Sequence, residues 1–353
     1  MSDVLEFGTD QDVYFGTGIR HETAGYVSSA GVGRALILTT PEQEHLGEDL
    51  VEALGARAAG VFAKAAMHTP VEVTAEALEH LQSSGADGIV SVGGGSTVGL
   101  GKALSLRTGV RQIALPTTYA GSECTPVLGQ TENGAKTTLT DPRVLPGTVL
   151  YDPELVATLP APMTVTSALN AMAHAVEALY AKDRSETSDR LAMSGLKAFR
   201  DSLPKVVTDP HDLGAREETQ RGAWACGTVL GRVGMALHHK LCHTLGGTLN
   251  LPHAETHAIV LPHAIAYNAE AVPDLLAPVA AVFGDDDPAR AVWDFAKALD
   301  APIALKDLEV SKDDLDRVAD LAVTNPYWNP REIDRDGILA LLGRAWNGDP
   351  PAA

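Results

Sequence analysis

The run Asp87-Gly88-Ile89-Val90-Ser91-Val92, followed at once by Gly93-Gly94-Gly95-Ser96, decides how the fold of this chain is interpreted. A short, nearly continuous apolar run is typical of a strand in a parallel sheet that is covered on both faces. Residues 97–106 then have the pattern of a helix. Glycines at such a junction let a diphosphate approach the backbone, where the free N–H groups of the helix favour negative charge. We interpret Gly93, Gly94, Gly95 and Ser96 as a nucleotide-binding turn, with a plain tight turn as the alternative.

Strands and helices alternate on both sides of this run. Apolar strands are predicted at 34–39, 60–64 and 112–115, and the last strands at 136–139 and 148–151. The alternation predicts an α/β N-terminal domain over residues 1–155, with a doubly wound, Rossmann-like parallel sheet. Helical periodicity predicts a second, all-α helical domain over residues 156–353, with its clearest segments at 164–181, 186–204, 215–234, 287–299, 312–323 and 335–346. We expect the functional site in the cleft between these domains.

A second turn, Pro116-Thr117-Thr118-Tyr119-Ala120-Gly121-Ser122-Glu123, follows the strand at 112–115. The hydroxyls of Thr117, Thr118 and Ser122 are expected at the carboxyl edge of the sheet, where open α/β sheets bind their ligands. An ordinary polar turn is the alternative. Thr39 ends the strand at 34–39, where a strictly NAD-dependent protein often has an acidic residue for the ribose diol. We therefore expect weak discrimination between NADH and NADPH.

The composition narrows the classes of function. The chain of 353 residues has a formal net charge of −19, which argues against nucleic acid and anionic membrane surfaces as partners. Its 3 cysteines are widely spaced, so no disulfide framework is predicted. The sequence shows no secretory leader and no apolar run close to the ~20 residues of a membrane span, so we expect a cytoplasmic protein. An anionic substrate would need local cations in such a chain.

Histidines recur at helical spacing in the second domain. His239 and His243 stand four residues apart, which places them on one helix face, about 40° apart around the axis. Asn170 and His174 repeat that spacing on a predicted helix at 166–180, and His253 follows a Gly-Gly break, at the end of a loop. Two helices with such pairs and a loop histidine are a known way to build a divalent-metal site. The pattern predicts a functional site, against the alternative of hydrogen-bonded core histidines.

One position departs from a metal site. Asn170 stands where a metal would favour a carboxylate. His238 and His257 lie nearby in the sequence without matching the spacing, and we interpret both as structural.

Together these segments resemble the iron-containing (group III) alcohol dehydrogenase superfamily over nearly the whole chain. The resemblance is carried by Gly93-Gly94-Gly95-Ser96, by Pro116-Thr117-Thr118, and by the block from His239-x3-His243 through Leu251-Pro252-His253 to Leu261-Pro262-His263. Within that family, the strings at 117–123 and 237–243 look like those of the maleylacetate reductases. The resemblance implies reduction of the carbon–carbon double bond of maleylacetate to 3-oxoadipate with NADH or NADPH, in the catabolism of aromatic compounds. It also implies a homodimer, and it leaves the acceptance of chloromaleylacetates open.

The resemblance carries over roles residue by residue. Metal-dependent relatives hold iron or zinc with an Asp and three His, and the matching positions here are Asn170, His174, His239 and His253. His243 matches a further histidine near the nicotinamide. Because an amide replaces the carboxylate at position 170, we expect no catalytic metal.

Hydrogen bonds are expected to take over the task of the metal. Hydride that adds to the alkene carbon β to the ketone forms a delocalised enolate, which N–H donors can stabilise without a Lewis acid. His243 or His253 is the predicted donor, while His174 and His239 hold the shape and polarity of the pocket. Further candidates are Tyr119 as a proton donor or carboxylate contact, Lys240 as a cation for a substrate carboxylate, and Lys136 at the cofactor ribose.

Two other functions stay open at this point. The first is a metal-dependent alcohol, lactaldehyde or polyol dehydrogenase on the same fold, which loss of activity in chelator would identify. The second is a nucleotide-binding protein without catalysis, such as a redox sensor, which steady NADH consumption with maleylacetate would exclude.

Overall fold

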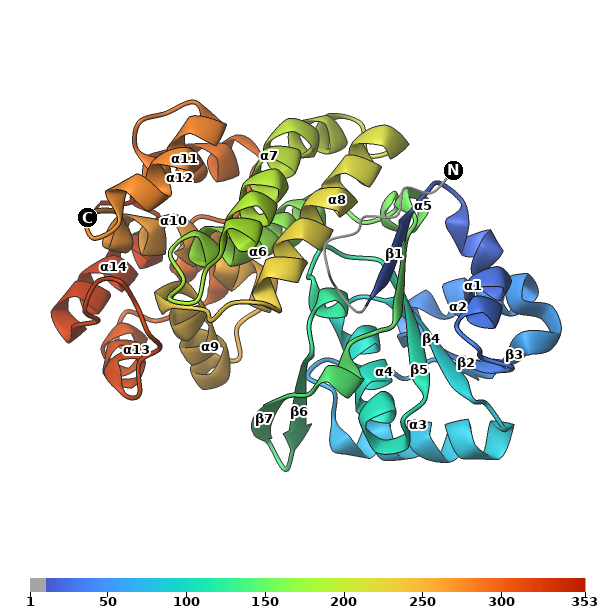
Figure 1. Cartoon of the computed structure of the whole chain (residues 1–353). Helices are drawn as coiled ribbons and strands as arrows, with labels where there is room; N and C mark the ends of the chain where they lie inside the picture. Colours follow the sequence, from blue (N-terminus) through green and yellow to red (C-terminus); the bar gives the residue numbers. More distant parts are fainter. Residues whose placement is uncertain (1–10, 353) are drawn as a thin grey trace. The chain divides into compact units, whose positions relative to one another are not determined.

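A six-stranded parallel sheet forms the centre of the first half of the chain (Figure 1). The computed structural model describes residues 11–352, apart from the side chains of Ala135 and Lys136. In sheet order the strands are β1 (Asp12–Phe15), β8 (Thr148–Tyr151), β5 (Arg111–Pro116), β4 (Gly88–Gly93), β2 (Ala35–Leu38) and β3 (Ala58–Phe62). Every neighbouring pair is parallel, which confirms the predicted type of sheet.

Helices cover both faces of this sheet. On one face, α1 (Thr23–Ser29) and α2 (Glu44–Leu54) pack in a core with Ile37. On the other face, α3 (Val71–Ser84) and α4 (Gly95–Thr108) pack in a core with Leu36. Successive residues of β2 thus enter different cores, as the alternation of side chains along a strand requires. The doubly wound arrangement predicted from the sequence is confirmed.

The direction of winding reverses beside β2. From β2 the chain moves outward to β3, then returns to β4 on the other side of β2 and continues to β5 and β8. Open α/β sheets bind their ligands outside the carboxyl ends of the strands at such a reversal. Thr39 follows β2 at this place, and Gly93 ends β4.

One predicted strand lies outside this sheet. Residues 136–139, expected among the last strands, belong to a separate antiparallel hairpin of β6 (Val127–Glu132) and β7 (Ala135–Thr140). Asn133 and Gly134 connect the two strands with φ values of 50° and 77°. The strand predicted at 136–139 is therefore confirmed as part of β7. Its partner β6 was not predicted, although Asn-Gly between two β-rich runs is the strongest short-range signal of a hairpin.

Contacts divide the chain into two compact units. Unit 1 comprises Met1–Leu159 and His211–Gln220, and unit 2 comprises Pro160–Pro210 and Arg221–Ala353. The short α5 (Pro153–Val156) lies near the end of the first stretch, and α8 (Leu213–Leu230) begins in unit 1 and ends in unit 2. The domain boundary near residue 155 stays a prediction.

Unit 2 is helical throughout its described elements, as predicted. Besides the end of α8 it contains α6 (Ala161–Leu179), α7 (Glu186–Thr208), α9 (Leu237–Leu249), α10 (His253–Ala269), α11 (Pro273–Phe283), α12 (Pro288–Ala298), α13 (Asp314–Val323) and α14 (Arg335–Asn347). α6 is buried on every side from Thr164 to Leu179, and α10 from Thr256 to Asn268. Helices that are apolar all round lie at the centre of a bundle, and these two pack against each other.

The helices on either side of the Gly-Gly pair differ from the prediction. α9 continues through Gly246 and Gly247, and it ends before Asn250, whose φ of 53° is left-handed. His253 follows the loop of residues 250–252, as predicted, and is the first residue of α10; the break between the helices lies at this loop and not at the Gly-Gly pair. A glycine costs a helix about 1 kcal/mol relative to alanine, and the buried packing of Leu245 in the same turn outweighs that cost.

Within the described residues, no helix has the length and apolar character needed to cross a bilayer.

Candidate functional site

The glycine turn after β4 has the geometry of an anion-binding turn. Gly93 has a φ of 155°, and a Cβ atom there would lie only 2.3 Å from Thr97 Oγ1, so this position requires glycine. α4 begins at Gly95, and Gly94 at its N-cap supplies no side-chain cap. The first amides of α4 are therefore not capped by a side chain, which is how a helix presents N–H groups to a phosphate.

The turn after β5 lies directly beside the glycine turn. β4 and β5 are paired up to Gly93 and Pro116, and the Thr117 amide donates to the Gly93 carbonyl at 3.1 Å. A Cβ atom on Gly94 would lie 3.1 Å from Thr118 Cγ2. The structure thus brings the two turns predicted from the sequence to one place on the sheet edge.

Gln43 connects two of the predicted threonines. Thr39 Oγ1 donates to the Gln43 carbonyl at 3.2 Å, and Gln43 Nε2 donates to Thr117 Oγ1 at 3.1 Å. Gln43 could not be predicted from the sequence, because its partner Thr117 is 74 residues away. Ser122 begins the short 3₁₀ turn Ser122–Cys124 that follows, and Lys136 lies in β7 with its side chain outside the described residues.

Tyr119 is fully buried within unit 1. Arg216, which is also fully buried, donates from Nη1 to the Tyr119 hydroxyl at 3.2 Å and from Nη2 to the Leu159 carbonyl at 3.1 Å. Burial raises the pKa of Tyr119, and the guanidinium of Arg216 opposes part of that rise. The tyrosine therefore has a buried cationic partner that the sequence analysis missed. Its role toward the substrate stays a prediction.

Three helices of unit 2 bring the predicted polar residues together. α6 carries Asn170 and His174, α9 carries His239 and His243, and α10 begins with His253; we call these five residues the histidine cluster. The ring centroids of His174 and His239 are 5.2 Å apart, and those of His239 and His243 are 5.9 Å apart. Burial, followed by the charges of His239, His253 and His243, holds the pKa of His174 well below its usual range. His174 is therefore neutral, and the other three histidines lie close enough to contribute to the lowering of its pKa.

Glu177 on α6 is the residue of this site that the sequence analysis missed. Its buried Oε2 accepts from His239 Nδ1 at 2.7 Å and from the Ala236 amide at 2.8 Å, and Oε1 accepts from the His238 amide at 2.7 Å. The carboxylate thus caps the N-terminus of α9 by accepting hydrogen bonds from its first amides, at the end where the helix dipole favours negative charge. It also fixes the hydrogen of His239 on Nδ1 and leaves Nε2 as the nitrogen with the free lone pair. An acidic residue in an otherwise apolar helix, three positions after His174, was the available signal.

The segment after α13 lies along α9. Tyr327 Oη is 3.1 Å from His243 Nδ1. Lys240 Nζ donates to the Thr324 carbonyl at 3.0 Å and lies 5.9 Å from the centroid of the Tyr327 ring. His243 and Lys240 therefore share one neighbouring segment, although they point in different directions from α9.

Exposure separates the histidine cluster into two parts. His243 and His253 are exposed, whereas His174 and His239 are 3% exposed each. A small substrate can therefore reach the first pair, while the second pair lies behind it.

The four positions that match metal ligands do not fit a hard divalent ion such as iron. Asn170 Oδ1, His174 Nδ1 and His239 Nε2 are buried without a hydrogen-bond partner in the described part of the chain, so donor atoms are available. They are an amide oxygen and imidazole nitrogens, however, and they bring no negative charge to the dication. Glu177, the carboxylate that touches the cluster, is already used by His239 and two backbone amides.

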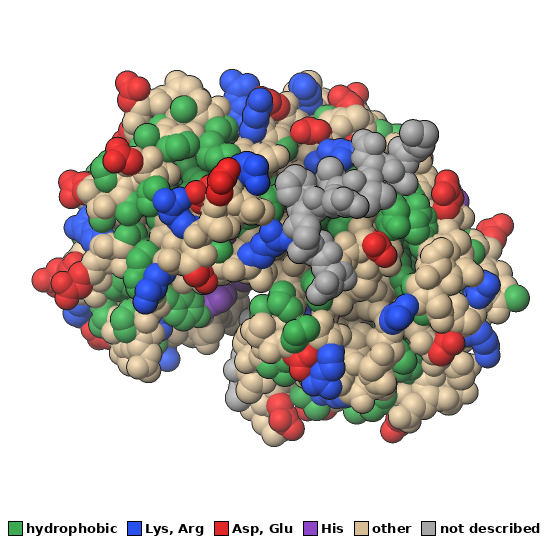
Figure 2. All heavy atoms as spheres, in the orientation of Figure 1, with side chains coloured by type: hydrophobic (Ala, Val, Ile, Leu, Met, Phe, Trp, Pro, Cys, Tyr) green, Lys and Arg blue, Asp and Glu red, His purple; other side chains and the backbone are tan. Residues whose placement is uncertain are grey.

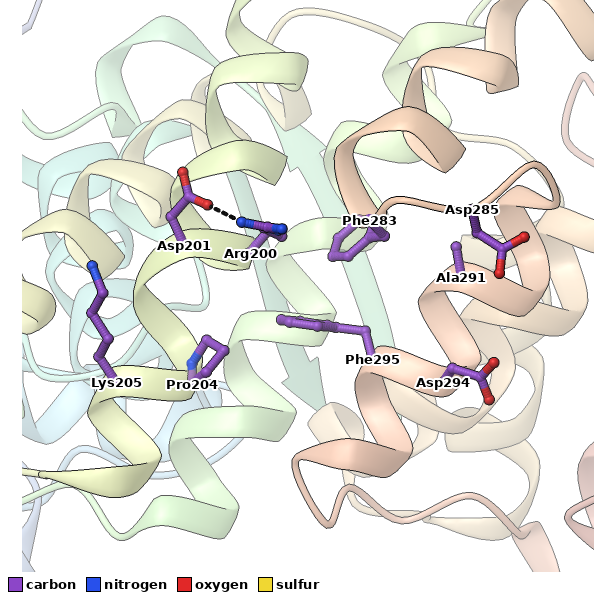
Figure 3. A pocket seen from close by; sticks show the side chains of 9 residues that line it. All are labelled: Arg200, Asp201, Pro204, Lys205, Phe283, Asp285, Ala291, Asp294 and Phe295. Carbon is purple, nitrogen blue, oxygen red and sulfur yellow. Dashed lines mark hydrogen bonds and ion pairs between the residues drawn. The ribbon is translucent and has the colours of Figure 1, made fainter.

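A hollow on the surface of unit 2 contains none of the predicted residues. It has a volume of about 680 Å³ and lies among α7, α11 and α12, with Phe283 and Phe295 on one side and Arg200 on the other (Figure 3). Arg200 Nη1 donates to Asp201 Oδ1 at 2.8 Å there. Acidic and basic side chains are likewise interspersed over the whole face shown in Figure 2. The hollow has no histidine or cysteine in its lining, so its chemistry is unrelated to that of the histidine cluster.

Two family descriptions match this chain. Residues 10–153 match the family described as iron-containing alcohol dehydrogenase, and residues 164–346 match the C-terminal part of the Fe-containing alcohol dehydrogenase family. Together they cover both units.

Individual relatives are similar over almost their full length. A maleylacetate reductase from a Rhizobium species is 56% identical over 339 residues, which are 96% of this chain and 96% of that protein. A maleylacetate reductase from Pseudomonas knackmussii is 50% identical over 92% of each chain. The crystal structure of maleylacetate reductase from Agrobacterium tumefaciens has a TM-score of 0.96 at 54% identity and covers 99% of this chain and 100% of that one. An iron-containing alcohol dehydrogenase from Corynebacterium glutamicum has a TM-score of 0.93 at 36% identity, covering 100% and 98%.

Proposed function

The chain belongs to the iron-containing alcohol dehydrogenase family and is an oxidoreductase, and from that premise we propose that it reduces the carbon–carbon double bond of maleylacetate. The product is 3-oxoadipate. The observation that carries the proposal is the full-length similarity to maleylacetate reductases, in a chain whose histidine cluster contains Asn170 in place of a carboxylate.

The cofactor is NADH or NADPH, as in other members of this NAD(P)-dependent family. When bound, the reduced nicotinamide supplies a hydride. The amides at the N-terminus of α4 hold the diphosphate, and the absence of side chains on Gly93, Gly94 and Gly95 lets it approach. Ser96, Thr117, Thr118 and Ser122 are the neighbouring hydroxyl donors, and Lys136 stays the candidate for the ribose on the family resemblance alone. Thr39 occupies the position of the usual acidic residue, so both cofactors are accepted.

The histidine cluster stabilises the enolate. When hydride adds to the alkene carbon β to the ketone, the electron pair of the double bond moves toward the ketone oxygen. An N–H of His243 or His253, the exposed members of the cluster, donates a hydrogen bond to that oxygen. A proton then reaches the α carbon and completes the saturated product, with Tyr119 as the candidate donor. His174 and His239 keep the pocket polar and in shape.

The two carboxylates of the substrate need cationic partners in a chain of net charge −19. Lys240 is the candidate, because its ammonium has three hydrogens and the Thr324 carbonyl accepts one of them. Its neighbour Tyr327 also contacts His243, so a carboxylate on Lys240 would lie near the predicted enolate donor.

The absence of a catalytic metal is part of the proposal. The rival function is that of a metal-dependent alcohol, lactaldehyde or polyol dehydrogenase on this fold. The experiment follows the loss of reduced-nicotinamide absorbance with maleylacetate, with and without a chelator such as EDTA. We expect equal rates in both. Loss of activity in chelator with recovery on Fe²⁺ or Zn²⁺ would favour the rival function, and no turnover at all would leave a binding protein without catalysis.

We also propose that the enzyme is a cytoplasmic homodimer. The expectation comes from the family resemblance, and light scattering on the purified full chain tests the oligomeric state. A mass of one chain would contradict it.

A further inference from the structure

Three buried residues behind the histidine cluster converge on one point. His238 and Cys242 stand four residues apart on α9, and His257 comes from α10. His238 Nε2 lies 2.9 Å from His257 Nδ1 and 3.6 Å from Cys242 Sγ. The three donor atoms all lie within 4.8 Å of one another. Among the described residues, this is the one group of three His, Cys, Asp or Glu side chains whose donor atoms lie this close together. We call it the His-Cys trio.

The chemistry of the trio favours a thiophilic dication. Two imidazole nitrogens and a sulfur are the ligands that zinc takes in proteins, whereas hard ions prefer oxygen. The hydrogen bond between His238 Nε2 and His257 Nδ1 requires one of these two nitrogens to accept, so at least one ring already presents a lone pair at the centre of the trio. His238 Nδ1 and His257 Nε2 are buried without a hydrogen-bond partner in the described part of the chain. The ring that donates in the hydrogen bond between them can therefore move its hydrogen to its outer nitrogen, which leaves both inner nitrogens for an ion.

The distances are close to those of a tetrahedral site. With Zn–S of about 2.3 Å and Zn–N of about 2.0–2.1 Å, tetrahedral angles give an N···S separation of about 3.6 Å and an N···N separation of about 3.4 Å. The N···S distance of 3.6 Å matches, and the N···N distance of 2.9 Å is that of a hydrogen bond. Insertion of an ion requires the two rings to separate by about half an ångström, which small rotations of the side chains supply.

We propose that His238, Cys242 and His257 form a binding site for one thiophilic divalent cation, with Zn²⁺ as the expected ion. The site is distinct from the four positions Asn170, His174, His239 and His253, and it contains the sulfur that those positions lack. The Cys242 thiol loses its proton to solvent as the sulfur–metal bond forms, and the hydrogen between the two imidazoles moves to an outer ring nitrogen. The bound ion links α9 to α10.

The ion has a short path to this site. The His253 ring is exposed and its centroid lies 4.2 Å from that of His257, so one imidazole separates the trio from solvent. The His239 ring lies 5.2 Å from both His238 and His257. The site therefore adjoins the histidine cluster without sharing a residue with it.

Cobalt is the probe that tests the proposal. The full chain is treated with chelator, freed of it, and titrated with Co²⁺ under anaerobic conditions while its absorption spectrum is recorded. We expect one equivalent of Co²⁺ to bind and to give a thiolate-to-cobalt charge-transfer band in the near ultraviolet. Zn²⁺ or Cd²⁺ should displace the cobalt and remove the band. This readout does not depend on turnover, so its failure is distinct from a failure of the proposed function.

Matched variants locate the ion. Cys242→Ala should abolish the band, and His257→Asn should weaken binding at least about tenfold, with thermal melting to verify that each variant is folded. Cys226→Ala removes an equally buried thiol on α8, and His174→Asn removes a ligand from the other set; both should keep the band. A wild-type chain without the band, or a band that survives in Cys242→Ala, would overturn the proposal. The proposal would also be overturned if cobalt bound without giving a thiolate band and if this binding were lost in His174→Asn.

Discussion

Glu177 Oε2 lies 2.7 Å from His239 Nδ1, and the same carboxylate accepts the amides of Ala236 and His238 at the start of α9. One side chain thus fixes both the beginning of a helix and the tautomer of a histidine in the candidate site. The aligned amides of α9 and the imidazole together satisfy a charge that is fully buried.

Replacing this carboxylate by an amide should destabilise the fold. Glu177→Gln keeps the shape but turns one of the accepting atoms into a donor, which then faces an N–H group. We expect a loss of roughly 1–3 kcal/mol in the free energy of unfolding, because a buried donor is left unsatisfied. Denaturant unfolding measures it. Glu186→Gln, at an exposed carboxylate on α7, is the control and should change stability by less than about 0.5 kcal/mol. Equal stability of wild type and Glu177→Gln would contradict the role of the carboxylate.

The two exposed histidines of the cluster, His243 and His253, should determine the rate of turnover. We expect His243→Ala and His253→Ala each to lower kcat with maleylacetate at least roughly 10²-fold, which is the usual cost of removing one oxyanion donor. Folding should stay intact because neither side chain is buried. His45→Ala, at an exposed histidine on α2, is the control and should leave kcat unchanged. Near-normal rates in both cluster variants would remove the assignment of the donors.

Restoring a carboxylate should restore affinity for a metal. Asn170→Asp adds a negative charge beside His174 and the lone pair on His239 Nε2, so the four positions then offer an anionic ligand with three imidazoles. Beyond the ion proposed for the His-Cys trio, we expect the variant to retain Zn²⁺ or Fe²⁺ at these four positions at least about tenfold more tightly than the wild type. Metal content after dialysis against a graded series of chelator concentrations measures this. Asn268→Asp, a buried amide on α10 that is not one of these four positions, is the control. Equal metal retention by the wild type and Asn170→Asp would show that the charge at position 170 does not determine the affinity of these positions for a metal ion.

A buried lysine in unit 1 should give stability a pH dependence. Lys102 Nζ donates to the Thr125 carbonyl at 2.8 Å, to Thr125 Oγ1 at 3.0 Å and to the Val127 carbonyl at 2.8 Å. Burial lowers the pKa of Lys102 from 10.5 to about 7, and the charge of Glu123 opposes part of that shift. Between these two values the unfolded chain binds a proton that the folded chain has released, so stability rises with pH across this window.

The comparison with Lys102→Met isolates that effect. Methionine cannot titrate, so the stability difference between wild type and variant should shift in favour of the wild type as the pH increases from about 7 to 9. Chemical denaturation at several pH values measures the difference. Lys64→Met, at a lysine that is 66% exposed, should show no such trend. A difference that is constant with pH would mean that the folded chain keeps the proton on Lys102, held by its three acceptors.

Regular spacing made much of the fold and part of the site predictable. The strand–glycine–helix junction at β4 follows from an apolar run and its glycines, which are local signals. Asn170, His174, His239 and His243 were found because residues four apart share a helix face. The same spacing links His253 to His257, but it indicates a shared helix face only once a helix is known to begin at His253.

The partners of these residues could not be predicted in the same way. Glu177 contacts His239 across 62 residues of chain, and Arg216 contacts Tyr119 across 97. A single charged residue inside an apolar helix indicates that some partner exists, because burial of an unpaired charge is costly, but not which one. The His-Cys trio depends on the packing of α9 against α10, which no periodicity within one helix reveals.

The close approach of Gly94 to Thr118 has a consequence for how this protein can evolve. A Cβ atom at position 94 would lie 3.1 Å from the threonine methyl, so an alanine there would force the Thr118 side chain to move by a few tenths of an ångström. Positions 94 and 118, distant in the gene, therefore constrain each other, and among related sequences a side chain at 94 should occur more often where position 118 holds a smaller residue than threonine.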